Sequence, residues 1–115
     1  MIVRDSLKPP LEALVVVDYL GRIVEFNRAA EELSGYSKHE LSRLSIYAFF
    51  DKDDYLNYLG EFTRIFLDGS ASEKLVFLHA KGGRPLFVRA SAKLSRFQGK
   101  PAITATLREE VVHVK

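Results

Sequence analysis

The side chains that could do chemistry in this chain of 115 residues are three histidines and three short runs of carboxylates. The histidines His39, His79 and His113 are far apart and lack the close spacing of metal ligands. The carboxylates occur at Glu31-Glu32, at residues 51–54 and at Glu109-Glu110. Each run falls at an expected helix end or polar face, where capping and solvation explain the charge. We therefore predict no metal site and no acid–base pair.

Nucleophiles and phosphate-binding loops are not indicated either. The sequence contains no cysteine, which excludes disulfides, thiolate metal sites and cysteine nucleophiles, and is compatible with a reducing cytoplasm. The serines lack the glycine-flanked context of a hydrolase nucleophile. Gly82-Gly83 followed by Arg84-Pro85 is typical of a hairpin turn rather than of a phosphate cradle. The sequence thus predicts a protein that is not an enzyme.

Composition sets the class of protein. The chain is 47% hydrophobic and 28% charged, as expected for one globular domain that can bury a core without disulfides. The net charge is +2, and Lys and Arg alternate with Asp and Glu, so we expect no nucleic-acid partner. Apolar runs fall far short of the ~18 residues that span a bilayer, and Arg4, Asp5 and Lys8 argue against a signal peptide. We expect a cytoplasmic protein without a membrane partner.

The first part of the chain encodes two strands and a capped helix. A β-branched run ends at residues 18–21, where Asp and Gly favour a hairpin turn, and residues 22–26 form the second strand. Asn27 is predicted to cap the following helix, and Gly35 to end it in the left-handed conformation. The apolar residues at helical spacing, which predict its buried face, are Ala29, Ala30, Leu33 and Tyr36.

The remaining elements complete an α+β domain. Ser37 and Glu40 form a capping box for a short helix. Residues 55–67 have the spacing of a longer main helix, preceded by Asp51, Asp53 and Asp54, which we expect to supply negative charge and a capping oxygen. Three alternating runs then predict strands at residues 74–80, 86–96 and 102–108. This order predicts one antiparallel sheet that carries the helices on a single face.

The order of these residues resembles the opening of PAS domains. The residues that match the family pattern in register are Asp18, Gly21, Ile23, Asn27, Ala29, Ala30, Gly35, Tyr36, Ser37, Glu40 and Leu41. The resemblance predicts a PAS domain at residues 11–109, an N-terminal flanking segment at 1–10 and a C-terminal linker stub at 110–115. It implies a PAS-like five-stranded antiparallel sheet in the order 2-1-5-4-3. It also implies a sensory and protein-interaction module in signal transduction, of the two-component type.

The family's cofactors are not expected here. Haem-binding members take their iron ligand from a histidine on the main helix, and residues 55–67 contain none. Flavin photosensors and the photoactive yellow protein type require a cysteine, which this chain lacks. His79 shares an expected strand face with Leu75 and Phe77, so it can face the cavity. We interpret it as a structural histidine at the rim, bonded to a backbone group.

PAS domains often enclose a cavity between the sheet and the middle helices. The small residues Ala90 and Ala92 opposite large aromatic side chains can leave space for a small apolar ligand, or the aromatic rings can fill that space themselves. The sequence does not decide between an open cavity and a filled one. The candidate lining residues are Phe49, Leu59, Phe62, Phe77, Val88, Ala90, Thr104 and Thr106.

The outer face of the sheet is the expected dimer surface. In the fourth strand, the set predicted to face the helices is Leu86, Val88, Ala90, Ala92 and Leu94. In the last strand, comparison with the family places Thr104 and Thr106 inward and the apolar set outward. The outer-face candidates are then Val15, Val17, Phe87, Ile103, Ala105 and Leu107. A second copy of the chain, residues 1–10, or both would cover this face, and we favour a homodimer.

Output is expected at the end of the last strand. The family usually carries an Asp-(Ile/Val)-Thr motif there. In this chain Glu109 keeps the charge, but the threonine is missing. The expected partner is a histidine kinase or another effector domain. The alternatives are a ligand-free dimerisation scaffold and, from another class, a small α+β enzyme such as a hotdog-like thioesterase.

Overall fold

The computed structural model describes residues 12–110. The predicted flanking segment, residues 111–115 of the linker stub and His113 lie outside this range. The strands are β1 (Ala13–Asp18), β2 (Ile23–Phe26), β3 (Ser70–His79), β4 (Pro85–Phe97) and β5 (Lys100–Glu109). The helices are α1 (Arg28–Ser34), α2 (Lys38–Leu41) and α3 (Tyr55–Asp68), with 3₁₀ turns at Ile46–Phe49, Lys52–Asp54 and Lys81–Gly83.

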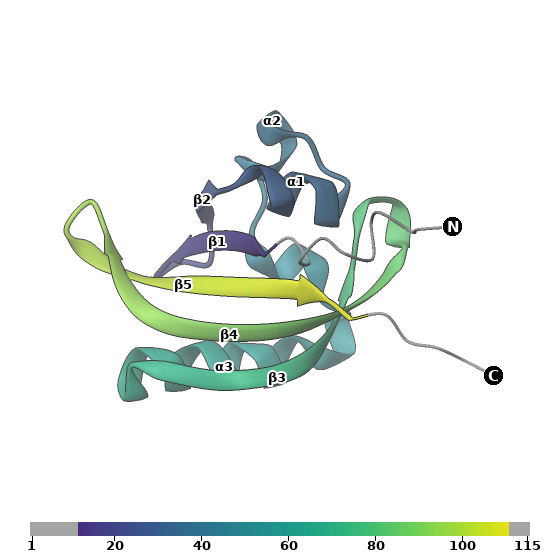
Figure 1. The fold of residues 1–115 in the computed structure, drawn as a ribbon. Coiled ribbons are helices and arrows are strands. Elements are labelled where there is room, and N and C mark those ends of the chain that lie inside the picture. The colour runs from purple at the N-terminus through teal and green to yellow at the C-terminus, as the bar shows by residue number, and fades with distance from the viewer. Residues whose placement is uncertain (1–11, 111–115) are drawn as a thin grey trace, which may run out of the picture.

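The five strands form one antiparallel sheet in the order β2-β1-β5-β4-β3. The helix α3 packs along β3, β4 and β5, whereas α1 packs against β1 (Figure 1). The two ends of the sheet are therefore covered by different helices. The predicted fold class and strand order are confirmed.

Asn27 does more than cap a helix. Its Oδ1 accepts hydrogen bonds from the backbone N–H of Ala30 and of Leu14, each at 3.0 Å. Its Nδ2 donates to the carbonyl oxygen of Glu12 at 3.0 Å. One side chain thus satisfies the first turn of α1 and ties that turn to β1. The predicted cap is confirmed, and so is the left-handed C-cap at Gly35, where φ is 79°.

The turn after β1 is held by a buried carboxylate. Asp18 Oδ1 accepts from the backbone N–H of Leu20 and of Arg22, each at 2.9 Å, and Oδ2 accepts from Arg22 Nε at 2.8 Å. Burial raises the pKa of Asp18, but the hydrogen bonds from Arg22 and Leu20 outweigh it, so the pKa lies below its ordinary value. At Gly21 φ is 87°, and an added Cβ would lie 2.7 Å from the ring of Tyr47. Only glycine suits that position.

The start of α3 differs from the prediction. Asp54 is its N-cap, yet the side chains of Asp54 and Asp51 accept no capping hydrogen bond from a backbone N–H. Asp54 has φ −97° and ψ −2°, which is helical rather than the extended geometry of a capping residue. A 3₁₀ turn at Lys52–Asp54 leads into the helix instead. The predicted negative charge is present, but the predicted capping oxygen is wrong.

The prediction for the last strand is wrong. The register places Leu107 opposite Ala90 and Ala105 opposite Ala92, so the apolar set of β5 faces the helices together with the small set of β4. Thr104 and Thr106 lie on the outer face, where their hydroxyls bond to the serine hydroxyls of β4 at 2.8 Å.

The cause is the two-residue turn between β4 and β5. Gln98 and Gly99 both have positive φ, 51° and 78°, and Phe97 pairs with Lys100. A two-residue loop of this kind fixes which residues of the two strands face each other. Since Ala90 and Ala92 face α3, their partners on β5 must do so as well.

The outer-face residues change accordingly. Val15 is opposite Ala105 and Val17 is opposite Ile103, so β1 turns these valines toward the helices. The outer-face predictions for Val15, Val17, Ile103, Ala105 and Leu107 are therefore wrong. Phe87 lies on the outer face, 40% exposed, with its ring 5.0 Å from that of Phe77.

Candidate functional site

A row of small side chains crosses the sheet beneath α3. Ala71 of β3 pairs with Ala92 of β4, Ala92 with Ala105 of β5, and Ala105 with Val15 of β1. Directly opposite residues in antiparallel strands share a face, so the four side chains form one floor. Three alanines in a row leave space under the helix, and a cavity of about 100 Å³ lies there.

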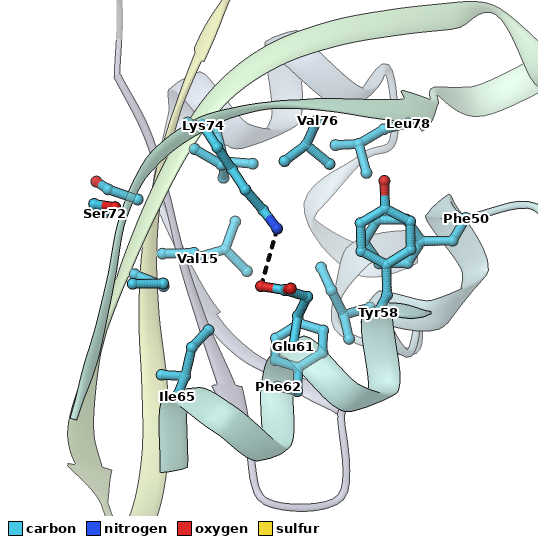
Figure 2. Close-up of a pocket in the computed structure, with 17 residues that line it drawn as sticks. Val15, Phe50, Tyr58, Glu61, Phe62, Ile65, Ser72, Lys74, Val76 and Leu78 are labelled. Carbon is cyan, nitrogen blue, oxygen red and sulfur yellow. Dashed lines mark ion pairs between the residues drawn. The ribbon is translucent and has the colours of Figure 1, made fainter. Parts of the chain in front are cut away.

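The walls of this cavity are almost entirely apolar. Tyr58, Phe62 and Ile65 of α3 close one side, and Phe50 stacks on Tyr58 with ring centroids 3.8 Å apart (Figure 2). The other lining residues are Ile46, Glu61, Ser72, Lys74, Val76, Leu78, Ala90, Ser91 and Leu107. A dry cavity of ~150 Å³ can hold benzene or xenon, so a cavity of about 100 Å³ suits a ligand of comparable or smaller size.

Only some of the residues that were predicted to line the cavity do so. Phe62 and Ala90 line the cavity. Phe49 and Val88 are buried in the core instead, at 6% and 0% exposure, and Leu59 is 39% exposed on α3. None of these three is among the lining residues.

Phe77, Thr104 and Thr106 lie on the opposite face of the sheet and cannot reach the cavity. Phe77 is opposite Phe87, and the two threonines bond to Ser95 and Ser91. The assignment of Thr104 and Thr106 to the lining is wrong because it followed the wrong face of β5. The assignment of Phe77 is wrong because this residue lies on the outward face of β3. The floor residues Ala71, Ala105 and Val15, together with Tyr58 and Ile65, were missed. The register of the hairpin turn at Gln98-Gly99 is the sequence signal for Ala105.

An ion pair lies at the mouth of the cavity. Lys74 Nζ of β3 is 2.9 Å from Glu61 Oε2 of α3 (Figure 2). The hydrogen bond from Lys74 lowers the pKa of Glu61 below its ordinary value. On the solvent side of the pair is a polar hollow lined by Asp54, Asn57, Tyr58, Glu61 and Lys74. Burial, with the nearby charge of Asp54, raises the pKa of Tyr58.

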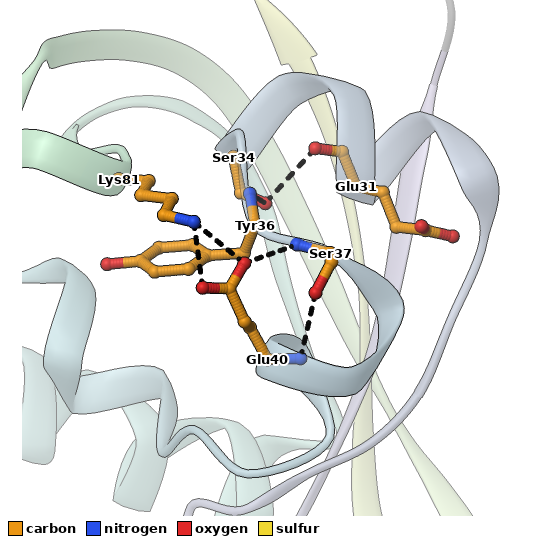
Figure 3. A network of polar contacts seen from close by, with 6 residues as sticks. All are labelled: Glu31, Ser34, Tyr36, Ser37, Glu40 and Lys81. Carbon is orange, nitrogen blue, oxygen red and sulfur yellow. Dashed lines mark hydrogen bonds and ion pairs between the residues drawn. The ribbon is translucent and has the colours of Figure 1, made fainter.

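A second polar cluster joins the hairpin between β3 and β4 to α2 (Figure 3). Glu40 completes the predicted capping box: its Oε1 accepts from the backbone N–H of Ser37 at 2.8 Å, and Ser37 Oγ accepts from the N–H of Glu40 at 3.2 Å. Lys81 Nζ donates to both carboxylate oxygens of Glu40, at 3.0 and 2.8 Å. The ammonium of Lys81 also lies 5.9 Å from the ring centre of Tyr36. The capping box is confirmed.

This cluster is expected to make the stability of the domain pH-dependent. The hydrogen bonds from Lys81 and from the backbone of Ser37 lower the pKa of Glu40 to about 2. A carboxyl group with a lowered pKa stabilises the fold above its ordinary value of 4.5 and loses that contribution as the pH falls toward 2. We expect Glu40→Gln to flatten the dependence of the melting temperature on pH in this window. Glu32→Gln is the control, and an equal flattening there would contradict the assignment.

His79 is bonded to a carboxylate rather than to a backbone group, which corrects the prediction. Its Nε2 lies 2.6 Å from Asp51 Oδ1, and its ring packs edge-on against Phe77. His79 does not line the cavity. Across residues 12–110, no group of three or more His, Asp or Glu is placed to hold a metal ion. In the same part of the chain, no helix is long and apolar enough to cross a bilayer.

The end of β5 is clamped to β4. The backbone N–H of Glu110 donates to the carbonyl oxygen of Phe87 at 2.8 Å, and the guanidinium of Arg89 donates to Glu110 Oε1 at 3.0 Å. Glu109, where the family motif places its charge, is 4.0 Å from Arg84. The charge that is held at the exit is therefore that of Glu110.

The strand order, the helices on one face and the cavity beneath α3 define a domain of PAS-type architecture. The family model described as PAS fold matches residues 12–109, and the chain belongs to the PAS family. PAS domains are generally sensory or interaction modules in signalling. No curated protein sequence matches the chain significantly.

Several solved PAS domains share the fold. One, from a Colwellia psychrerythraea protein, has a TM-score of 0.75 and 19% identity, with 86% of each chain covered. A domain of a sensory box sensor histidine kinase/response regulator from Geobacter sulfurreducens has a TM-score of 0.71 and 22% identity, covering 84% of this chain and 82% of that one. A PAS domain from a two-component sensor histidine kinase has a TM-score of 0.72 and 17% identity, covering 86% and 85%.

Proposed function

We propose that this PAS domain binds a small apolar molecule in the cavity beneath α3 and relays its presence through the C-terminal end of β5. The observation that carries the proposal is the row of Ala71, Ala92 and Ala105, which leaves a cavity of about 100 Å³ under a helix rich in aromatic residues. An apolar cavity favours an apolar ligand, because a polar group placed in it would lose its hydrogen bonds to water.

The path of β5 supports the proposed relay. Ala105 and Leu107 line the cavity, and three residues after Leu107 the side chain of Glu110 is held by Arg89 and its backbone by Phe87. A ligand that pushes on the floor therefore acts on the same strand that leaves the domain. We propose a histidine kinase or similar effector as the partner and the cytoplasm as the location, by analogy with the similar structures from sensor kinases.

We propose no enzymatic activity. Of the residues that line the cavity, the carboxylate is that of Glu61, and no histidine is among them. A general acid needs a raised pKa, whereas Lys74 lowers the pKa of Glu61. The charge pairing thus argues against the thioesterase alternative.

Xenon is the probe that tests ligand binding, since it needs only an apolar space. We expect xenon pressure to shift the methyl NMR signals of Val15, Ala92 and Ala105, with saturation, and to leave the exposed outer-face methyls of Leu75 nearly unchanged. The relay adds a second expectation, a shift of the Glu110 amide. Equal, non-saturating shifts at Leu75 and at the lining methyls would overturn the proposal.

A ligand-free dimerisation scaffold is the second candidate function. It is favoured by the apolar side chains on the outer face, where Phe77 and Phe87 pack together beside Leu75, which is 50% exposed. Burial of such a patch is a common basis for association. Sedimentation of the purified protein separates the candidates: a dimer that Phe87→Glu dissociates, with no xenon binding, would support the scaffold.

A further inference from the structure

The ion pair between Glu61 and Lys74 occupies the boundary between two different environments. On one side is the apolar cavity and on the other the polar hollow, and both residues line both spaces. Each comes from a different wall, Glu61 from α3 and Lys74 from β3, with 2.9 Å between Nζ and Oε2 (Figure 2). Within residues 12–110, this is the ion pair that joins α3 to the sheet.

The sheet is irregular at this place. The register of β3 against β4 shifts between Ala71 and Lys74, so the strand bulges where it forms the rim of the cavity. A bulged edge strand is held by fewer ladder hydrogen bonds than a regular one. The link from Lys74 to α3 therefore contributes to holding the rim in place.

We propose that the Glu61–Lys74 pair is a latch that narrows the mouth of the cavity by tying α3 to the rim of β3, so that an apolar ligand passes faster when the pair breaks. The inference rests on the proposed function and adds its regulation. The glutamate and lysine side chains are 36% and 49% exposed. Pairs with such exposure are weak and are screened by salt, which suits a contact that must open repeatedly.

The test compares xenon exchange in the intact chain and in variants that remove one charge. Lys74→Met matches the lysine side chain as far as its Cε atom and removes the charge, and Glu61→Gln keeps the shape of the glutamate side chain. We expect either change to raise both the association and the dissociation rate constants of xenon by about two- to fivefold, the range that an exposed ion pair supports, with little change in affinity. The double exchange Glu61→Lys with Lys74→Glu should restore slow exchange.

A matched control exists on the other face of the sheet. Arg108 and Glu73 form an ion pair at 3.3 Å with similar exposure, 39% and 50%, away from the cavity. Arg108→Met should leave the xenon rates unchanged. Added salt should speed exchange in the unmodified chain and not in Lys74→Met. The salt series on the unmodified chain does not depend on how well any variant folds.

The outcomes are distinguishable. Xenon binding with the same rates in the unmodified chain and in both single variants, and without a salt effect, overturns the latch and leaves the proposed function standing. If Arg108→Met accelerates xenon exchange as much as Lys74→Met does, the latch is also overturned. The acceleration would then come from a general loosening of the domain and not from the loss of this ion pair. No saturable xenon binding in any form overturns the function and the latch together.

Discussion

Replacement of Ile103 by alanine is expected to lower the free energy of unfolding by about 2–5 kcal/mol. Ile103 has 0% exposure and lies on the helix face of β5, opposite Leu94 and Val17. Removing its side chain leaves a cavity among neighbours that cannot move freely, so the loss exceeds the transfer free energy of the missing carbons. Urea denaturation followed by circular dichroism measures this difference.

The neighbouring threonine is the matched control. Thr104 points to the other face, where its hydroxyl donates to Ser95 Oγ at 2.8 Å, so Thr104→Ala removes one hydrogen bond and should cost about 0.5–1.5 kcal/mol. If Thr104→Ala lowered the free energy of unfolding more than Ile103→Ala, the register of β5 would be wrong. Thr104 would then face the helices, as the comparison with the family predicts. The pair of variants therefore tests the register of β5 directly.

The face of β5 is the part of the sheet that was predicted wrongly from the sequence, whereas the face of β4 was predicted correctly. The alternation in β4 correctly predicted that Ala90 and Ala92 face the helices. A strand with one small apolar set and one polar set has a clear inner face. In β5 both sets are compatible with burial, since threonine has nearly the shape of valine and can be buried when its hydroxyl is hydrogen-bonded. The decisive information was in the turn: a two-residue loop at Gln98-Gly99 makes the face of β4 determine the face of β5.

Local features were predicted well for a related reason. The cap at Asn27, the C-cap at Gly35 and the capping box of Ser37 and Glu40 each depend on residues within four positions of one another. Their hydrogen bonds follow from backbone geometry that the sequence specifies locally. The contacts of Asn27 with Glu12 and Leu14 depend on the pairing of β1 with β2 and were not visible at that level.

The cavity also depends on contacts between residues that are far apart in the sequence. Its floor combines Ala71, Ala92, Ala105 and Val15 from four strands, and no one strand carries a signal for it. The pair of Glu61 and Lys74 depends in addition on the register shift in β3, which has no clear sequence marker. Of the predicted lining, Phe62 and Ala90 remained because each lies on the inward side of an element whose face had been assigned correctly.

Ala92→Leu is expected to abolish xenon binding, weakening it by more than about tenfold, because the larger side chain would occupy the floor of a cavity of only about 100 Å³. Ala92 is the middle alanine of the row, between Ala71 and Ala105, so its added atoms point under α3 rather than to an edge. Xenon titration by NMR measures the loss.

The free energy of unfolding of Ala92→Leu shows whether the leucine fills the cavity or disrupts the packing around it. A side chain that fits the space adds roughly 0.5–2 kcal/mol to the free energy of unfolding, whereas overpacking costs about 1–3 kcal/mol. Lys93→Leu places the same residue one position along on the opposite, exposed face, and should leave xenon binding intact. If Ala92→Leu folds normally and still binds xenon as tightly as the unmodified chain, the binding site is not beneath α3. The alanine row would then be a packing feature, and the case for a ligand sensor would give way to that for a dimerisation scaffold.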